Sequence, residues 1–111
     1  MKASISSTLA RLPGPPTARY PQGVPFATVM AGGTTSVEVF APKGADTQQP
    51  HDQDALYFVH SGTAKIVING QRFDAAAGDA FFVAAGVAHG FENFSEDFVT
   101  WVVFYGSQGG Q

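Results

Sequence analysis

Apolar and polar residues alternate along short stretches of the chain from Phe26 onwards. Within TSVEVF, at residues 35–40, Ser36, Glu38 and Phe40 occupy one face and two valines occupy the other. A repeat of two is typical of a β-strand, whose successive side chains point to opposite faces. Stretches of this kind, or rich in β-branched and aromatic residues, predict seven or eight short strands, within residues 26–31, 35–40, 55–60, 63–68, 71–75, 80–84, 89–94 and 98–105.

Turn residues separate the predicted strands. Asn69-Gly70 is the strongest hairpin signal, because a two-residue type I′ turn needs residues that tolerate a positive φ. Residues 41–50, APKGADTQQP, form a longer polar loop. Short strands with a turn every eight to twelve residues predict an all-β sandwich or barrel. The sequence has no internal repeat and no linker that would divide it into further domains.

The first 23 residues have a different pattern. Ile5, Leu9 and Leu12 are spaced as on one side of a helix, and the PGPP stretch at residues 13–16 would end that helix. We expect an N-terminal arm that lies across the barrel or across a neighbouring subunit. The predicted organisation is therefore an arm at 1–23, a barrel domain at 24–106 and a flexible tail at 107–111.

Size and charge exclude several classes of function. A chain of 111 residues and 11.6 kDa is one domain. It has no cysteine, so disulfides, thiolate metal sites and thiol nucleophiles are excluded. Its six Lys and Arg residues are scattered and its net charge is −3, so we expect no nucleic-acid partner. No apolar run approaches the ~20 residues of a membrane helix or the core of a signal peptide, which predicts a cytoplasmic protein without a membrane partner.

Aromatic content favours self-association. Charged residues make up only 14% of the chain, and it contains ten Phe residues. A domain this small leaves some of these apolar groups exposed, and an exposed apolar patch is typical of a partner surface. We therefore expect a homodimer. The alternative is a barrel core that contains every Phe side chain.

A spaced set of residues near the C-terminus carries a family resemblance. Gly78 is followed after five residues by Ala84, and then come Gly86, His89 and Asn93. These spacings resemble the second motif of the cupin superfamily, which has Pro where this chain has Ala84. The resemblance implies a jelly-roll barrel, also called a double-stranded β-helix, over roughly residues 26–106. It also implies dimers, since small members of the superfamily commonly pair.

The first cupin motif matches in spacing but not in chemistry. Counting back seven positions from Gly62 reaches Ala55, where the family has its metal-binding Glu. The family's two preceding His positions then fall on Gln49 and His51. The resemblance therefore implies that a divalent metal ion (Zn, Ni, Fe or Mn) would be held by His51, His89 and Gln49, without the carboxylate. The alternatives are hydrogen-bonded histidines in a vestigial cavity and a Gln49 that caps loop backbone.

The missing carboxylate weakens the implied metal site. Imidazole nitrogens suit Zn, Cu, Fe and Ni, and a carboxylate adds charge and affinity. Asp54 is next to Ala55, so its side chain is expected on the opposite face of the strand. Gln53 has the parity needed to reach the site, and a substrate carboxylate or a water molecule could also complete it. The residues expected to bind a substrate are Gln53, Tyr57, Phe91 and Trp101, with ordinary core packing as the alternative for Tyr57 and Trp101.

Two other polar residues have structural interpretations. His60 has the parity opposite to His51, which predicts a surface or interface position. Asp79 follows Gly78 and is typical of a turn residue that bonds its own backbone.

Two functions remain open at the level of sequence. The first is a cupin with a divalent metal in the barrel, of the kind used for dioxygenase or isomerase chemistry on a small organic acid or aromatic compound. The second is a non-catalytic cupin whose cavity binds a small molecule or nothing. Neither a Ser-His-Asp pattern nor a phosphate-binding loop is present.

Overall fold

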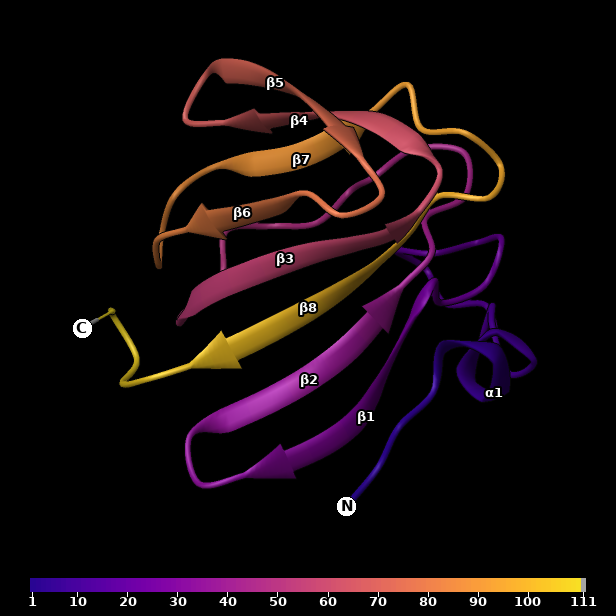
Figure 1. Cartoon of the computed structure of the whole chain (residues 1–111), viewed down its shortest axis with the longest axis horizontal. Coiled ribbons are helices and arrows are strands. Elements are labelled where there is room, and N and C mark those ends of the chain that lie inside the picture. The colour runs from indigo at the N-terminus through magenta and orange to yellow at the C-terminus, as the bar shows by residue number, and fades with distance from the viewer. Residues whose placement is uncertain (111) are drawn as a thin grey trace.

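Two antiparallel β-sheets make up the fold, which is drawn in Figure 1 from a computed structural model that describes residues 1–110. Every stretch predicted to be a strand is one, and the all-β jelly-roll prediction is confirmed. The strands are β1 (Phe26–Gly32), β2 (Thr35–Phe40), β3 (Asp54–Ser61), β4 (Thr63–Ile68), β5 (Gln71–Ala76), β6 (Ala80–Val83), β7 (His89–Glu92) and β8 (Val99–Tyr105).

Strand order brings distant parts of the chain together. The larger sheet has the order β1-β2-β8-β3-β6 and the smaller has the order β5-β4-β7. The last strand, β8, therefore lies between β2 and β3, as Figure 1 shows. Glu38, Val102 and Tyr57 stand directly opposite one another on these three strands. Opposite residues share a face, so these side chains all point between the two sheets.

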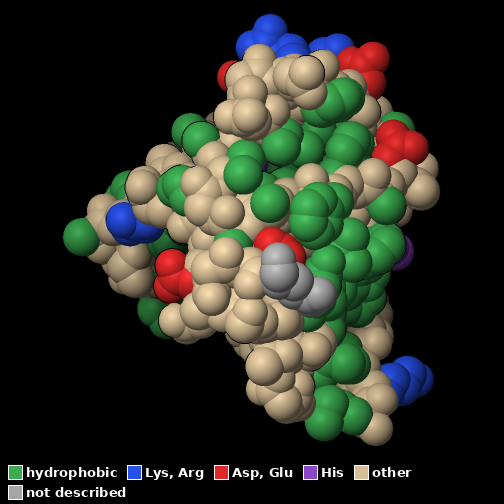
Figure 2. All heavy atoms as spheres, turned by 90° about the vertical axis from the view of Figure 1, so that its left-hand side faces the viewer, with side chains coloured by type: hydrophobic (Ala, Val, Ile, Leu, Met, Phe, Trp, Pro, Cys, Tyr) green, Lys and Arg blue, Asp and Glu red, His purple; other side chains and the backbone are tan. Residues whose placement is uncertain are grey.

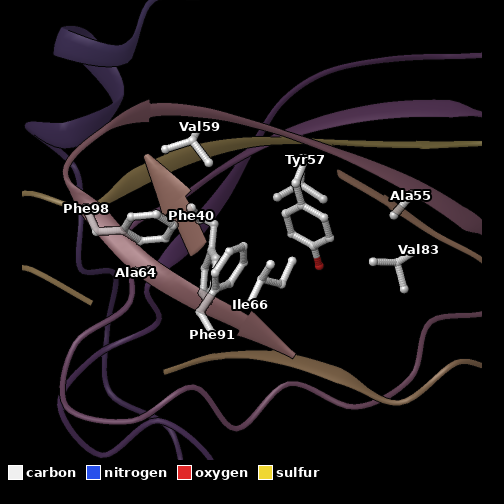
Figure 3. Close-up of a cluster of buried hydrophobic side chains, with 11 residues drawn as sticks. Phe40, Ala55, Tyr57, Val59, Ala64, Ile66, Val83, Phe91 and Phe98 are labelled. Atoms are coloured by element: carbon white, nitrogen blue, oxygen red, sulfur yellow. The ribbon is translucent and has the colours of Figure 1, made fainter. Parts of the chain in front are cut away.

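The core fills the space between the sheets. Tyr57, Ile66 and Phe98 are fully buried there, and Phe91 contacts both aromatic rings (Figure 3). Burial of large aromatic groups contributes about 2–3 kcal/mol each, which makes this cluster the main stabilising unit. Ala55 belongs to the same cluster and is 0% exposed.

The N-terminal arm contains the expected helix, α1 (Ile5–Leu9). The Ser4 hydroxyl oxygen accepts a hydrogen bond from the Ser7 backbone N–H and caps the first turn. Ile5 packs on Val39 and Val99, which point outward from the larger sheet. The arm therefore lies across its own barrel.

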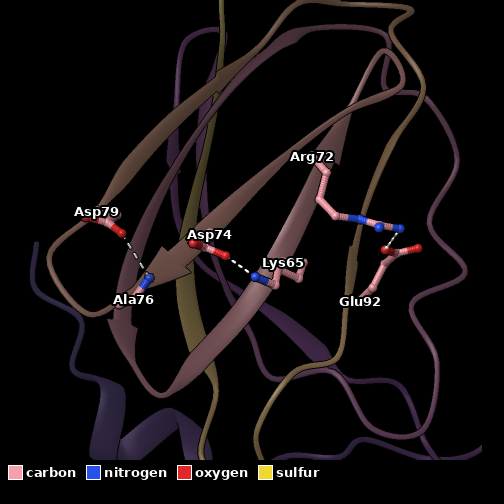
Figure 4. Close-up of polar contacts among 6 residues, drawn as sticks. All are labelled: Lys65, Arg72, Asp74, Ala76, Asp79 and Glu92. Carbon is pink, nitrogen blue, oxygen red and sulfur yellow. Dashed lines mark hydrogen bonds and ion pairs between the residues drawn. The ribbon is translucent and has the colours of Figure 1, made fainter.

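The outer face of the smaller sheet is polar. Lys65 on β4 pairs with Asp74 on the adjacent β5, and Arg72 on β5 pairs with Glu92 on β7, across the intervening β4 (Figure 4). Asp79 accepts a hydrogen bond from the Ala76 backbone N–H at 2.9 Å, as expected of a turn residue. These groups are exposed, so each ion pair contributes at most about 1 kcal/mol.

The end of the described chain is held by hydrogen bonds. The Gly109 N–H donates to the Asp52 carbonyl, and the Ser107 hydroxyl donates to the Gly110 carbonyl. The predicted flexible tail covers 107–111, and residue 111 lies outside the described residues. None of the helices within residues 1–110 has the length and apolar character needed to cross a membrane.

Candidate functional site at the barrel mouth

Two histidines meet at one end of the barrel. His51 lies in the loop before β3, and His89 is the first residue of β7. Their ring centroids are 4.5 Å apart, and the rings are inclined by 65°. The Gly86 N–H donates to the His51 carbonyl at 2.8 Å, which joins the loop before β3 to the loop before β7.

The His89 ring is held at both nitrogens. Nδ1 lies 2.9 Å from the Val87 carbonyl oxygen, which can only accept, so Nδ1 carries a proton and donates. In the neutral ring Nε2 then has a free lone pair. The Tyr57 hydroxyl lies 3.0 Å from Nε2, and the Gln48 Oε1 lies 2.9 Å from it.

Gln48 is oriented by an acidic neighbour. Its Nε2 donates to Asp46 Oδ2, so its Oε1 is turned toward His89 and Tyr57. The same Asp46 oxygen accepts the Phe91 N–H at 2.8 Å, which fastens the loop to β7. The result is two acceptor atoms, His89 Nε2 and Gln48 Oε1, that face each other at 2.9 Å. Such a contact requires a proton or a cation at that point.

His51 has one nitrogen without a partner. Its Nδ1 is buried and makes no hydrogen bond, and its ring packs edge-on against Phe104 at 4.7 Å. Burial, followed by the effect of His89, lowers the pKa of His51 to about 4, although Asp52 opposes the shift. His51 is therefore a neutral imidazole at physiological pH, which is the form that binds metals.

Tyr57 supplies a neutral hydroxyl. Burial raises the pKa of Tyr57 well above its ordinary value, and the carboxylates of Asp46 and Glu38 raise it further. The hydrogen bond to Gln48 opposes this effect only in part. The phenol therefore keeps its proton and acts as a donor toward Gln48 or His89.

A cavity of about 260 Å³ opens beside the histidines. His51, Gln48 and Tyr57 form its polar wall, while Phe26 and Phe40 are on its apolar side. Its remaining lining residues are Arg19, Tyr20, Glu38, Gln49, Pro50 and Val102. Polar groups that converge next to an apolar wall are typical of small-molecule sites.

The loop before β3 carries three glutamines, and the structure places them differently. Gln49 lines the cavity but is exposed, and the neighbouring Gln48 is the residue that reaches His89. Gln53 does not reach the site, since its Nε2 donates to the carbonyls of Thr34 and Gly106. Sequence spacing missed Gln48 because residues 41–53 form an irregular loop, in which strand parity does not apply.

Two predicted substrate-binding aromatics lie elsewhere. Trp101 points outward from the larger sheet and packs with Val39 and Val99 near α1, because it stands opposite Phe58 on the outer face. Phe91 is buried in the core against Tyr57 and does not line the cavity. Tyr57 itself does line the cavity.

The donor set fits a divalent metal only in part. Within residues 1–110, no group of three or more His, Asp or Glu side chains is arranged to hold a metal ion. The available set is two imidazoles and an amide oxygen. A separation of 2.9 Å between His89 Nε2 and Gln48 Oε1 also suits neighbouring ligands with bonds of about 2.1 Å. Asp54 does not substitute for a carboxylate at position 55, since its Oδ1 accepts the Ala85 N–H away from this site.

Comparison with known proteins gives a consistent family and fold. A family model described as a cupin domain matches residues 36–105. The uncharacterized protein SCO3923 of Streptomyces coelicolor is 48% identical over 59 residues, which is 53% of this chain and 56% of that protein. The match therefore spans little more than half of the relative's length.

Solved structures share the same fold. A cupin-2 domain protein from Shewanella frigidimarina aligns with a TM-score of 0.67 at 15% identity, over 91% of each chain. KdgF from a Halomonas species aligns with a TM-score of 0.63 at 20% identity, over 71% of this chain and 74% of its own. At these identities the likeness concerns the fold alone.

Proposed function

The chain belongs to the cupin family, and from that premise we propose that its barrel mouth binds a divalent metal ion beside a cavity for a small organic molecule. His51 and His89 would be the nitrogen ligands, and the Gln48 amide oxygen would take the place of the predicted Gln49. The candidate ions are Zn, Ni, Fe and Mn, of which the first three are well suited to imidazole ligands.

One observation supports this proposal above all others. His89 Nε2 and Gln48 Oε1 bring two lone pairs to within 2.9 Å, while the proton of the His89 ring is held on Nδ1 by Val87. A histidine that donates its other ring proton to a backbone carbonyl is the usual arrangement of a metal ligand. The buried, unpartnered Nδ1 of His51 lies in the ring next to it.

The residues around the proposed ligands each have a defined part in this site. Asp46 orients Gln48, Val87 fixes the His89 tautomer, and the Tyr57 hydroxyl donates within the cluster. A bound divalent metal would act as a Lewis acid, as in dioxygenase- or isomerase-type chemistry. Because position 55 has no carboxylate, the ion's charge is less well neutralised, and we expect weaker binding than in a site that has the family's Glu.

Elemental analysis of protein purified without an affinity tag tests the proposal. We expect near-stoichiometric metal after incubation with one of the four ions, and its loss in both His51→Ala and His89→Ala. His60→Ala is the matched control, since His60 is an exposed histidine on β3. Absence of metal from wild-type protein after all four incubations would refute a metal site.

A metal-free binding protein is the second candidate. A proton on His89 Nε2 would let it donate to Gln48 Oε1, and the cluster would then be complete without a metal. The chain would in that case be a non-catalytic cupin that binds a small molecule in the same cavity. The elemental analysis distinguishes the two candidates directly.

A further inference from the structure

Glu38 is the one carboxylate among the residues that line the cavity. It stands opposite Val102 on β8, and Val102 stands opposite Tyr57 on β3. Adjacent strands are about 4.8 Å apart, so the Glu38 and Tyr57 backbones are separated by about 10 Å across the cavity floor. A ligand in the cavity would therefore lie between Glu38 and the cluster of Tyr57 and the histidines.

The Glu38 carboxylate is poorly compensated. Burial raises the pKa of Glu38, and the hydrogen bond with the Thr28 side chain offsets this only in part. Arg19 also lines the cavity, but the ion pairs among residues 1–110 are Lys65–Asp74 and Arg72–Glu92. Glu38 therefore has no cation from residues 1–110 within ion-pair distance, and a donor on a ligand would supply the missing interaction.

We propose that Glu38 selects the ligand of this cavity and that the ligand is a small, non-anionic molecule with an amine or hydroxyl donor on an apolar body. The donor would face Glu38, and the apolar body would face Phe26 and Phe40. Arg19 is exposed, so solvent screens its charge, while the half-buried Glu38 is screened less. The repulsion from Glu38 therefore outweighs the attraction of Arg19, which disfavours a carboxylate ligand. This inference rests on the proposed function in placing the ligand in the cavity beside the histidines.

Three probes of one size test the ligand class. Benzylamine, benzyl alcohol and benzoate are titrated into uniformly ¹⁵N-labelled protein, and amide shifts of the cavity residues give the affinities. We expect benzylamine to bind most tightly and benzoate most weakly. In Glu38→Gln, which keeps the side-chain shape, the benzylamine affinity should fall at least about tenfold, as expected for loss of a charged hydrogen bond.

Matched variants make the result specific. Glu96→Gln removes an exposed carboxylate away from this cavity and should leave all three affinities unchanged. Arg19→Gln should change benzoate affinity less than about threefold, because an exposed charge contributes little. Benzoate binding as tightly as benzylamine, an unchanged benzylamine affinity in Glu38→Gln, or no response to any probe would each overturn the proposal.

Metal content of the same samples separates this proposal from the metal site. Glu38→Gln should keep the wild-type metal content, because Glu38 is not one of the proposed ligands. Glu38-dependent amine binding without metal would leave the inference standing and remove the metal site.

A separate observation concerns the outer face of the larger sheet. One apolar residue from each of its five strands forms a row, in which each member stands opposite the next. The row consists of Phe82, Leu56, Val103, Val37 and Met30. Phe82 is 50% exposed, and Phe58 beside the row is 42% exposed. Figure 2 shows hydrophobic side chains in a continuous band along one flank of the molecule.

The family resemblance already implies a homodimer, and we infer that this face is the surface through which two copies of the chain pack. The N-terminal arm covers the part of this face around Val39 and Val99, while Phe82 and Phe58 keep about half of their surface exposed. The row contains no charged residue, so two copies can pack face to face without like-charge repulsion. Sheets packed in this way are about 10 Å apart.

Analytical ultracentrifugation of the full chain tests this surface. We expect wild-type protein to sediment as a dimer of 11.6 kDa chains, and the double variant Phe58→Glu/Phe82→Glu to be a monomer with a wild-type circular dichroism spectrum. Phe73→Glu is the control, because Phe73 is 43% exposed but lies on the smaller sheet. A monomeric wild type at 100 µM, or a monomeric Phe73→Glu beside a dimeric double variant, would overturn the inference.

Discussion

Position 55 holds an alanine where the family has its metal-binding Glu. Ala55 is fully buried between Val83 and Phe104 on the neighbouring strands. Phe104 in turn packs against the His51 ring, so the methyl group of Ala55 points toward the histidine end of the barrel. The family's carboxylate position is thus retained in the backbone but filled by an apolar group.

Restoring the carboxylate should strengthen the metal site. In Ala55→Glu we expect metal affinity to rise at least about tenfold, because the ion gains an anionic ligand. In metal-free protein we expect unfolding free energy to fall by about 1–3 kcal/mol, since a larger polar group enters a packed core. Isothermal titration and urea denaturation measure the two effects.

Ala55→Gln is the control for this change. It adds the same volume without the charge, so it should lose similar stability and gain little affinity. Equal metal affinity in wild type and Ala55→Glu would mean that position 55 does not face the histidines.

His51 should make the stability of metal-free protein depend on pH. In the unfolded chain its imidazole takes up a proton near pH 6.5, but in the fold only near pH 4. Between these values the unfolded state binds more protons, so the free energy of unfolding falls as the pH falls. The loss is at most about 3 kcal/mol, and exposure of part of the ring reduces it.

Urea denaturation between pH 7 and pH 4 with a chelator checks this dependence. His51→Gln should show a flatter profile than wild type, and His60→Gln is the control at an exposed histidine. Identical profiles for wild type and His51→Gln would contradict the assignment.

Among the elements, the turn between β3 and β4 is the most constrained. Gly62 has a φ of 78°, and a Cβ there would lie 2.6 Å from both Phe98 Cα and Ser95 Oγ. Gly70, in the hairpin between β4 and β5, has a similar φ of 82°, but a Cβ there would meet nothing within 4 Å. A side chain at either position would therefore strain the backbone, but only a side chain at Gly62 would also be crowded by neighbouring atoms.

Alanine at these two glycines separates strain from crowding. We expect Gly70→Ala to lower the free energy of unfolding by about 1–2 kcal/mol through the positive φ alone. Gly62→Ala should cost about 2 kcal/mol more, because the backbone at Phe98 must move. Thermal and urea denaturation of both variants measure the difference, and equal losses would show that the turn can relax.

The elements with a regular pattern of apolar and polar residues are those that could be predicted from the sequence. The alternation of apolar and polar residues is visible in the sequence, so every strand could be predicted. The placement of Glu38 and Phe40 on the same face of one strand could be predicted as well. The site also needed strand order, since the row of Glu38, Val102 and Tyr57 exists only because β8 separates β2 from β3. Strand order is set by long-range packing, and no local pattern encodes it.

The differences between the predicted and the observed positions of the site residues have the same physical origin. Trp101 lies on the outer face of β8 because the register of β8 with β3 determines which face points inward, and no local pattern shows that register. The motif spacing reaches Gln49 by counting residues through a loop, where the Asp46 side chain determines that the Gln48 amide turns inward. The convergence of His51 and His89 could be anticipated, because the spacing of both motifs follows from the strands that carry them.

At the scale of the whole molecule, association should be coupled to stability. If two copies share the outer sheet face, the folded dimer is favoured by mass action and the melting temperature rises with protein concentration. We expect a rise of a few degrees over a hundredfold increase in wild-type concentration and none in Phe58→Glu/Phe82→Glu. Differential scanning calorimetry measures both, and a concentration-independent wild type would argue for a monomer.

The central place of β8 also has a consequence for the order of folding. Strands β2 and β3 each pair with β8 but not with each other, although β8 follows β3 by nearly forty residues. The five-stranded sheet therefore cannot form during synthesis until residue 105 has left the ribosome, and until then β1–β2 and β3–β6 can form only as separate strand pairs. Such non-local pairing predicts folding in milliseconds to seconds rather than microseconds, with the β2 and β3 edges open to chaperones until the last strand is inserted.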